Sequence, residues 1–186
     1  MKIYTRKGDD GTTGLLYGGR VPKDDSGPVA YGDVDEAVAV LGLARAEVKP
    51  TDPLHDELLR LQRSLFIVGA ELATAPGNHH KLVDDETRVT EAMVDGLETA
   101  IDEVVEERGM PDGFLVPGSN RLGAALDLAR ATVRRAERNA VSHAGRGGYE
   151  RSHVVPYLNR LADYLFMLAR AAEESWTPSK QEENTP

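Results

Sequence analysis

The chain of 186 residues contains no cysteine, and this absence removes several classes of chemistry. Disulfide bonds, thiol nucleophiles and cysteine-ligated metal sites are excluded. No apolar run approaches the roughly 18 residues of a membrane span, and the N-terminus lacks the apolar segment of a secretion signal. We therefore expect no membrane partner and a cytoplasmic location.

Positive charge is also scarce, since 22 Lys and Arg face 31 Asp and Glu, for a net charge of −9. A nucleic-acid partner is not expected, because such a protein needs a basic surface. Four of the few cations nevertheless fall within nine residues, as Arg130, Arg134, Arg135 and Arg138. Arginine suits phosphate or a buried carboxylate. The cluster is therefore either an anion site or a solvated helix face with i,i+4 ion pairs.

The arginine cluster lies on a predicted helix that begins after Ser119 or Asn120, either of which can cap it. An apolar stripe at three- and four-residue steps runs along it and predicts a core-facing side. Similar periodicities predict helices over 29–48, 54–72, 87–107 and 156–174. The connections are short, so the fold class is all-α, an up-and-down bundle of five helices. The bundle domain would span 29–176, and the tail 177–186 is predicted to be disordered.

The first 28 residues form a separate, non-helical N-terminal arm, with six glycines and two prolines. Residues 2–5 are a short strand candidate. Residues 5–14 combine glycines, hydroxyls and cations, which can present backbone amides and charge to phosphates. They do not match the Walker sequence, and a flexible surface arm is the other interpretation.

Several further residues have two interpretations. The acid Asp33 is expected to interact with the dipole of the first helix, whereas Asp35 and Glu36 are candidates to hold arginines in place. Phe114 is by its residue type a core aromatic. The pair His79-His80 lacks a spaced third ligand, so we expect no metal site there.

Three stretches together resemble the PduO-type ATP:cob(I)alamin adenosyltransferases, over nearly the whole chain and in the right order. They are YTRKGDDGTTG with GGRVPKDD, FLVPG with LARATVRRAER, and YLNRLADYLF. The resemblance implies a homotrimer of ferritin-like, cobalamin adenosyltransferase-like five-helix bundles with active sites between subunits. ATP and cob(I)alamin would be the substrates, with Mg²⁺ on the phosphates, and adenosylcobalamin and triphosphate the products. A reductase and an adenosylcobalamin-dependent enzyme would be further partners. A non-catalytic carrier that binds ATP or adenosylcobalamin, and a purely structural bundle, are the competing hypotheses.

The resemblance also implies roles for individual residues. Arg130 and Asp35 would form an ion pair between subunits and, with Arg134 and Phe114, the catalytic set. Phe114 would close over the lower face of the corrin. The remaining assignments are cobalamin contacts at Phe114, Asp163 and Phe166, and ATP contacts at Thr5, Arg6, Lys7, Gly8, Thr13, Gly14, Lys23, Arg134, Arg135, Glu137, Arg138 and Asn159.

Two of these positions need a separate remark. Glu137 is the candidate protein ligand for Mg²⁺, which would otherwise be held by the ATP phosphates. Asp127 stands where many members of the family carry histidine. An acid at this position is near enough in sequence to pair with Arg130 or Arg134.

Overall fold

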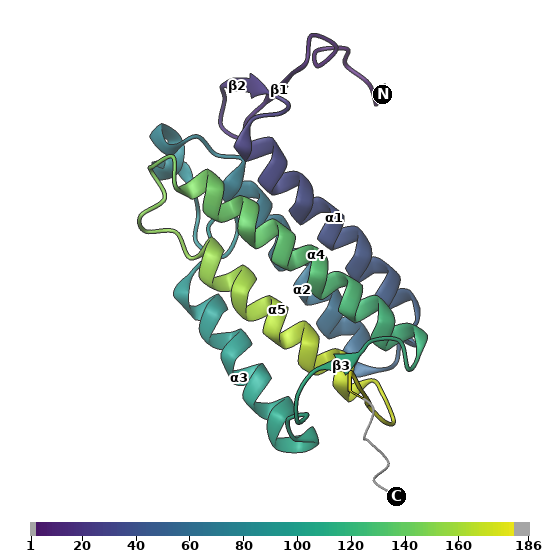
Figure 1. Ribbon diagram of the computed structural model, residues 1–186. Helices are drawn as coiled ribbons and strands as arrows, with labels where there is room; N and C mark the ends of the chain where they lie inside the picture. Colours follow the sequence, from purple (N-terminus) through teal and green to yellow (C-terminus); the bar gives the residue numbers. More distant parts are fainter. Residues whose placement is uncertain (1–2, 181–186) are drawn as a thin grey trace, which may run out of the picture.

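The computed structural model describes residues 3–180, and five α-helices form a bundle (Figure 1). A 3₁₀-helix, η1, lies between the second and third of them. The predicted all-α, five-helix architecture is confirmed. The helices are α1 Ser26–Ala46, α2 Pro53–Leu72, η1 Pro76–Lys81, α3 Glu91–Arg108, α4 Arg121–Ala144 and α5 Val154–Ala171.

Polar side chains that cap the N-termini explain where most of the helices begin. Asn120 accepts a hydrogen bond from the amide of Gly123 at 2.7 Å, which confirms the predicted cap of α4. Asp25 caps α1 in the same way, so this helix begins three residues before the predicted position. The acids at 33–36 therefore lie beyond its first turn, which contains no acid. The expected interaction of Asp33 with the helix dipole is wrong, because that effect is confined to the first turn.

Helix α4 occupies the centre of the arrangement, packed against α1 on one side and α5 on the other. Helix α2 covers α1, and α3 covers α5. The predicted apolar stripe of α4 faces this core, where Leu126, Ala129 and Val133 are fully buried. The hydroxyl of Ser26 contacts the ring of His143, so α1 and α4 run antiparallel. Outside this stripe, Arg134 and Arg138 are exposed, whereas Arg130 and Arg135 are half-buried.

Two short strand pairs flank the bundle. In the arm, β1 Thr12–Gly14 pairs with β2 Arg20–Pro22 in an antiparallel hairpin. The expected strand at 2–5 is not formed by the described residues 3–5. At the other end, β3 Leu115–Val116 pairs with β4 Thr177–Pro178.

The start of the tail therefore differs from the prediction of disorder. The amide of Ser179 donates to the carbonyl of Phe114 at 2.8 Å, which adds a hydrogen bond beside the β3–β4 pair. Residues 181–186 of the predicted tail lie outside the described residues. None of the described helices combines the length and the apolar character needed to cross a bilayer.

Candidate functional site

A polar pocket of about 310 Å³ lies between α4 and α5. Four of the predicted ATP contacts line it, and the exposed Val141 completes the lining. The amide of Asn159 donates to Oε1 of Glu137 at 3.0 Å, and the guanidinium of Arg138 donates to the backbone carbonyl of Arg134 at 3.0 Å. The structure thus brings together two cations, a carboxylate and an amide: Arg134, Arg138, Glu137 and Asn159. We call this the arginine pocket.

Arg135 points in a different direction, toward α1. Its Nε donates to Oδ1 of Asp33 at 3.0 Å, and its Nη2 donates to the carboxylate of Glu36. Asn139 also donates to Asp33, at 2.5 Å. The hydrogen bonds with Glu36 and then Asp33 raise the pKa of Arg135. These contacts confirm that Glu36 holds an arginine, whereas the predicted contact of Arg135 with ATP stays a prediction.

A second pocket, of about 370 Å³, contains Phe114 and Phe166 together with Arg130. The side chain of Phe114 is 88% exposed, so its interpretation as a core aromatic is wrong. Phe114 follows Gly113, whose positive φ of 97° turns the chain before β3. We call this the phenylalanine pocket. Asp163, the third predicted cobalamin contact, is exposed and is not part of its lining.

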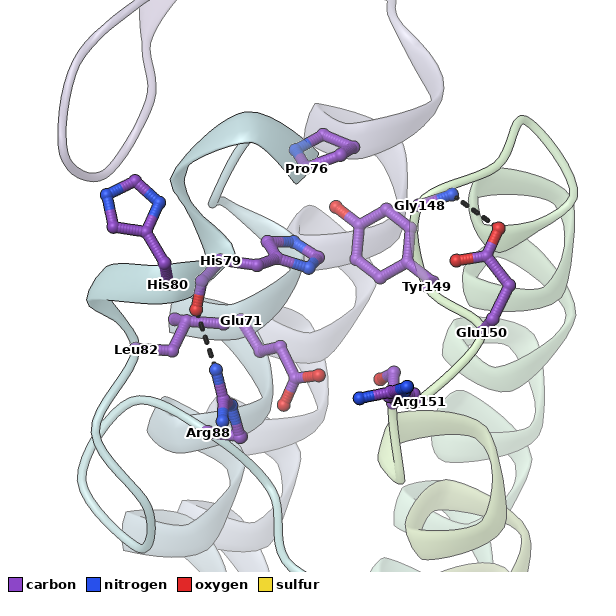
Figure 2. Close-up of a pocket in the computed structure, with 11 residues that line it drawn as sticks. Glu71, Pro76, His79, His80, Leu82, Arg88, Gly148, Tyr149, Glu150 and Arg151 are labelled. Atoms are coloured by element: carbon purple, nitrogen blue, oxygen red, sulfur yellow. Dashed lines mark hydrogen bonds between the residues drawn. The ribbon is translucent and has the colours of Figure 1, made fainter.

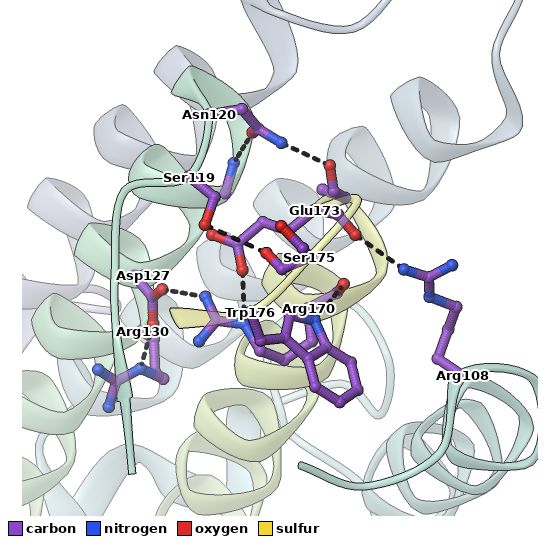
Figure 3. A network of polar contacts seen from close by, with 11 residues as sticks. Arg108, Ser119, Asn120, Asp127, Arg130, Arg170, Glu173, Ser175 and Trp176 are labelled. Atoms are coloured by element: carbon purple, nitrogen blue, oxygen red, sulfur yellow. Dashed lines mark hydrogen bonds and ion pairs between the residues drawn. The ribbon is translucent and has the colours of Figure 1, made fainter. Parts of the chain in front are cut away.

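Arg130 is held within the chain by Asp127 (Figure 3). Nε of Arg130 lies 3.0 Å from Oδ1 of Asp127, and Oδ2 of Asp127 accepts from Nη2 of Arg170 at 2.5 Å. The possibility that Asp127 pairs with Arg130 is confirmed, but its second partner is Arg170 rather than Arg134. Arg170 was not predicted from the sequence. The one sequence feature that could have indicated it is the presence of an arginine on the otherwise apolar, buried side of α5.

The acid Asp35 lies on another side of the bundle. It is exposed on α1 and borders a hollow between α1 and α2 that also contains Tyr31 and Phe66. Phe66 is 63% exposed there. The ion pair of Arg130 within the described part of one chain is with Asp127, so the pairing of Asp35 with Arg130 between subunits stays a prediction.

The N-terminal arm projects beyond the first turn of α1 (Figure 1). The guanidinium of Arg20 donates to the carbonyl of Lys7 at 2.5 Å and to the hydroxyl of Thr12 at 2.6 Å. The amide of Lys23 donates to the carbonyl of Gly11 at 2.9 Å, which closes a loop. The lining of the arginine pocket comes from α4 and α5 and includes none of the seven predicted ATP contacts in the arm: Thr5, Arg6, Lys7, Gly8, Thr13, Gly14 and Lys23.

A larger pocket, of about 400 Å³, lies between η1 and the link that follows α4 (Figure 2). The sequence did not indicate it. His79 contacts the carbonyl of Thr74 at 3.1 Å and meets the ring of Tyr149 edge-on. Burial raises the pKa of Tyr149 to about 12. Among residues 3–180, no group of three or more His, Asp or Glu side chains could hold a metal ion.

The comparisons with known proteins agree with this geometry. The family model for cobalamin adenosyltransferase matches residues 3–172. The chain belongs to the cobalamin adenosyltransferase family. The match runs from the arm through both arginine-lined pockets to the end of α5, so it includes all three stretches on which the resemblance rested.

Individual members of the family are similar over nearly their whole length. The corrinoid adenosyltransferase of Mycobacterium tuberculosis (strain ATCC 25618 / H37Rv) is 42% identical, over 95% of this chain and 93% of that protein. The Citrobacter freundii corrinoid adenosyltransferase is 40% identical, over 92% and 95%. A variant PduO-type ATP:corrinoid adenosyltransferase from Lactobacillus reuteri, solved with cobalamin and ATP, aligns with a TM-score of 0.85, at 31% identity over 98% of this chain and 97% of that chain.

Proposed function

We propose that this protein is a corrinoid adenosyltransferase, which moves the 5′-deoxyadenosyl group of ATP to cob(I)alamin and releases triphosphate. The observation that carries the proposal is the adjacency of the two pockets on α4. Arg130 lines the phenylalanine pocket and Arg134 lines the arginine pocket. Residues four apart on a helix are separated by about 6 Å along its axis. An apolar face for a corrin and a cationic site for a triphosphate therefore lie side by side, as the reaction requires.

The reaction needs no nucleophile from the protein, in keeping with the residues present. Cob(I)alamin supplies an electron pair to the 5′ carbon of ATP, so a cobalt–carbon bond forms as the carbon–oxygen bond breaks. Triphosphate departs with the electron pair of the broken bond. Arg134 and Arg138 would stabilise the charge that develops on this leaving group. Their fixed placement beside the phenylalanine pocket would align the reacting atoms.

Magnesium is part of the proposal, and the donor set of the arginine pocket suits it. Mg²⁺ prefers oxygen ligands and is often held by one or two carboxylates together with substrate phosphates. Glu137 supplies a carboxylate there, and its Oε1 is held by Asn159 at 3.0 Å. When bound, the ion would supply charge neutralisation on the triphosphate. Asn159 would thereby orient Glu137.

Phe114 would have a different task, at the lower face of the corrin. Packing of an exposed apolar ring against another apolar surface removes both from water, which lowers the free energy. In that position Phe114 would exclude water and the dimethylbenzimidazole base from the lower axial site. Loss of an axial ligand makes the cobalt(II) precursor easier to reduce. Phe166 lines the same pocket, and we assign Asp163 to its exposed rim.

We further propose a homotrimer in which each active site forms between two subunits. Asp35 of one copy would pair with Arg130 of the next, and the arm of one copy would cover ATP in the arginine pocket of another. The exposed Phe66 beside Asp35 supports an interface on α1 and α2. A cytoplasmic location, a reductase that supplies cob(I)alamin and an adenosylcobalamin-dependent enzyme that receives the product complete the proposal.

The test is anaerobic turnover of chemically reduced cob(I)alamin with Mg·ATP. We expect the absorbance of cob(I)alamin to fall while chromatography detects adenosylcobalamin and triphosphate in equal amounts. Reactions without ATP and with heat-denatured protein are the controls. Binding of both substrates without product would favour the carrier hypothesis, and binding of neither would leave the structural bundle.

A further inference from the structure

A row of alternating charges runs from the end of α5 to the phenylalanine pocket (Figure 3). It consists of Glu173, Arg170, Asp127 and Arg130, and we call it the charge row. Nε of Arg170 lies 3.1 Å from Oε2 of Glu173, Nη2 of Arg170 lies 2.5 Å from Oδ2 of Asp127, and Oδ1 of Asp127 lies 3.0 Å from Nε of Arg130. Only the last member reaches the surface appreciably, since the side chain of Arg130 is 30% exposed and the other three are 5% or less.

Stability alone does not account for such an arrangement. Burying charges costs several kcal/mol per ion, and a buried ion pair is often no better for stability than apolar residues of similar volume. An ion pair does fix the orientation of its side chains, because a guanidinium and a carboxylate match in a defined geometry. Three of the side chains oriented in this way, Asp127, Arg130 and Arg170, line the phenylalanine pocket.

Asp127 determines which part of Arg130 is available to other molecules. Within residues 3–180, the described hydrogen bond of Arg130 uses Nε, so its two terminal nitrogens are left to face the pocket or a second chain. If Asp127 lost its charge, no negative charge would lie between the guanidinium groups of Arg130 and Arg170, and these two cations would repel each other. Arg130 would then turn toward solvent.

Arg170 acts on a second member of the same pocket. Its guanidinium carbon lies 5.2 Å from the centre of the Phe166 ring, within the range of a cation–π contact. Its backbone carbonyl accepts from the indole of Trp176 at 3.1 Å, which holds the chain after α5. One buried side chain therefore contacts the ring of Phe166 directly and Arg130 through Asp127.

We propose that Asp127 and Arg170 are positioning residues for corrinoid recognition, which fix Arg130 and Phe166 in the phenylalanine pocket without contacting ATP. The inference rests on the proposed function, because it assigns the corrinoid to that pocket. The inference predicts different effects on the binding of the two substrates, since the arginine pocket contains no member of the charge row. Loss of either positioning residue therefore weakens recognition of the corrinoid and spares ATP.

The first variant is Asp127→Asn, which keeps the shape of the side chain and removes its charge. We expect the KM for cob(I)alamin to rise about tenfold, the size of one charge-assisted contact, while the KM for ATP changes less than about twofold. Titration with cob(II)alamin in the presence of ATP, followed by its visible spectrum, measures binding without turnover. Equal changes in both KM values, or no change in either, would overturn the inference.

A purely structural role is tested by removing the buried charges altogether. In the triple variant Asp127→Leu, Arg170→Met, Glu173→Gln no buried charge of the row is left unpaired, so we expect its thermal stability to match or exceed the wild type. Corrinoid binding should nevertheless stay about tenfold weaker. Wild-type corrinoid binding in a stable triple variant would show that the row serves the fold alone. If this variant does not fold, Asp127→Asn and its titration decide the question.

Two further variants provide controls. Glu71→Gln changes a buried acid on α2 that accepts from the amide of Val89 at 2.7 Å and lines the pocket beside η1, not the phenylalanine pocket. We expect it to lower stability and leave both KM values unchanged. Arg170→Lys keeps the charge but loses the planar fork, so corrinoid binding should fall between wild type and Asp127→Asn. If the wild-type protein shows no turnover, that result counts against the proposed function. The cob(II)alamin titration would still test the role of the charge row, because it measures corrinoid binding without turnover.

Discussion

Arg134 and Arg135 are neighbours in the sequence with opposite surroundings, and this contrast gives the sharpest test at the scale of single residues. Arg134 lines the arginine pocket, whereas Arg135 binds Asp33 and Glu36 on α1. We predict that Arg134→Ala lowers kcat for adenosyl transfer by a factor of at least about 100, because a donor to developing charge is lost. Arg135→Ala should retain most activity and lower the free energy of unfolding by about 1 kcal/mol, the upper range for a partly exposed ion pair.

Steady-state kinetics and urea unfolding of the two variants measure these effects side by side. Asp33→Asn is the matched control, because it weakens the same contacts from the α1 side. A catalytic loss in Arg135→Ala as large as that in Arg134→Ala would show that Arg135 contacts ATP in the assembled enzyme. Full activity of Arg134→Ala would remove the leaving-group role from the arginine pocket.

At this scale the sequence predicted residue types better than it predicted partners. The resemblance grouped Arg134, Glu137, Arg138 and Asn159, and the structure places them around one pocket. The same reasoning missed the pairing of Asp127 with Arg170, because these residues are 43 positions apart and their contact depends on how α4 packs on α5. Residue type alone also placed Phe114 in the core, where it does not lie.

At the scale of elements, the helices follow from periodicity and the errors fall at their ends. The apolar stripe of α4 and its cap Asn120 were predictable because both depend on neighbours within one turn. The true start of α1 at Ser26, capped by Asp25, was missed because the glycine and proline that follow suggested a loop. The β3–β4 pair joins segments some 60 residues apart, and no local pattern specifies such a pairing.

The junction of α1, α4 and the link after α4 contains a histidine whose charge depends on pH. The hydroxyl of Tyr149 donates to the carbonyl of Thr74 at 3.1 Å, so it accepts from Nε2 of His143 at 2.8 Å. Nδ1 of His143 lies 2.8 Å from the hydroxyl of Ser26, which donates to Oδ1 of Asp25 at 3.2 Å. Burial is the main cause that lowers the pKa of His143 from its ordinary 6.5, outweighing the opposing effect of Asp25.

A lowered pKa in the folded state means that the unfolded chain binds the proton more readily. The contribution of His143 to stability is therefore complete above pH 6.5 and is lost as the pH falls from there through its lower folded pKa. We predict that the free energy of unfolding decreases between about pH 7 and pH 5.5, and that His143→Gln flattens this slope. Urea unfolding at several pH values measures it. His80→Gln, which changes an exposed ring, should leave the slope unchanged, and the idea fails if both variants behave alike.

At the scale of the whole molecule, one chain presents two different surfaces that suit each other. The α1–α2 side carries Asp35 and the exposed Phe66, and the α4–α5 side carries Arg130 and the arginine pocket. Surfaces of this kind join head to tail, and closure of the rotation produces a ring rather than an isologous dimer. The proposed trimer is such a ring, and it would bring the arm of one copy to the pocket of another.

Subunit complementation tests whether each active site belongs to two chains. Lys7→Ala alters the arm without removing the backbone carbonyl that Arg20 binds, and Arg134→Ala alters the arginine pocket, so each variant alone should be inactive. When the two are co-expressed in equal amounts, random assembly leaves about one site in four with an intact arm and an intact pocket, because the interface is heterologous. Isolation with two different affinity tags removes both homotrimers, and every remaining mixed trimer has one intact site of three, so we predict about a third of wild-type turnover from it. Sedimentation equilibrium checks the trimer itself. A site built within one chain would give no activity in the mixture, since every chain would carry one defect, and that result would place the arm over the pocket of its own subunit.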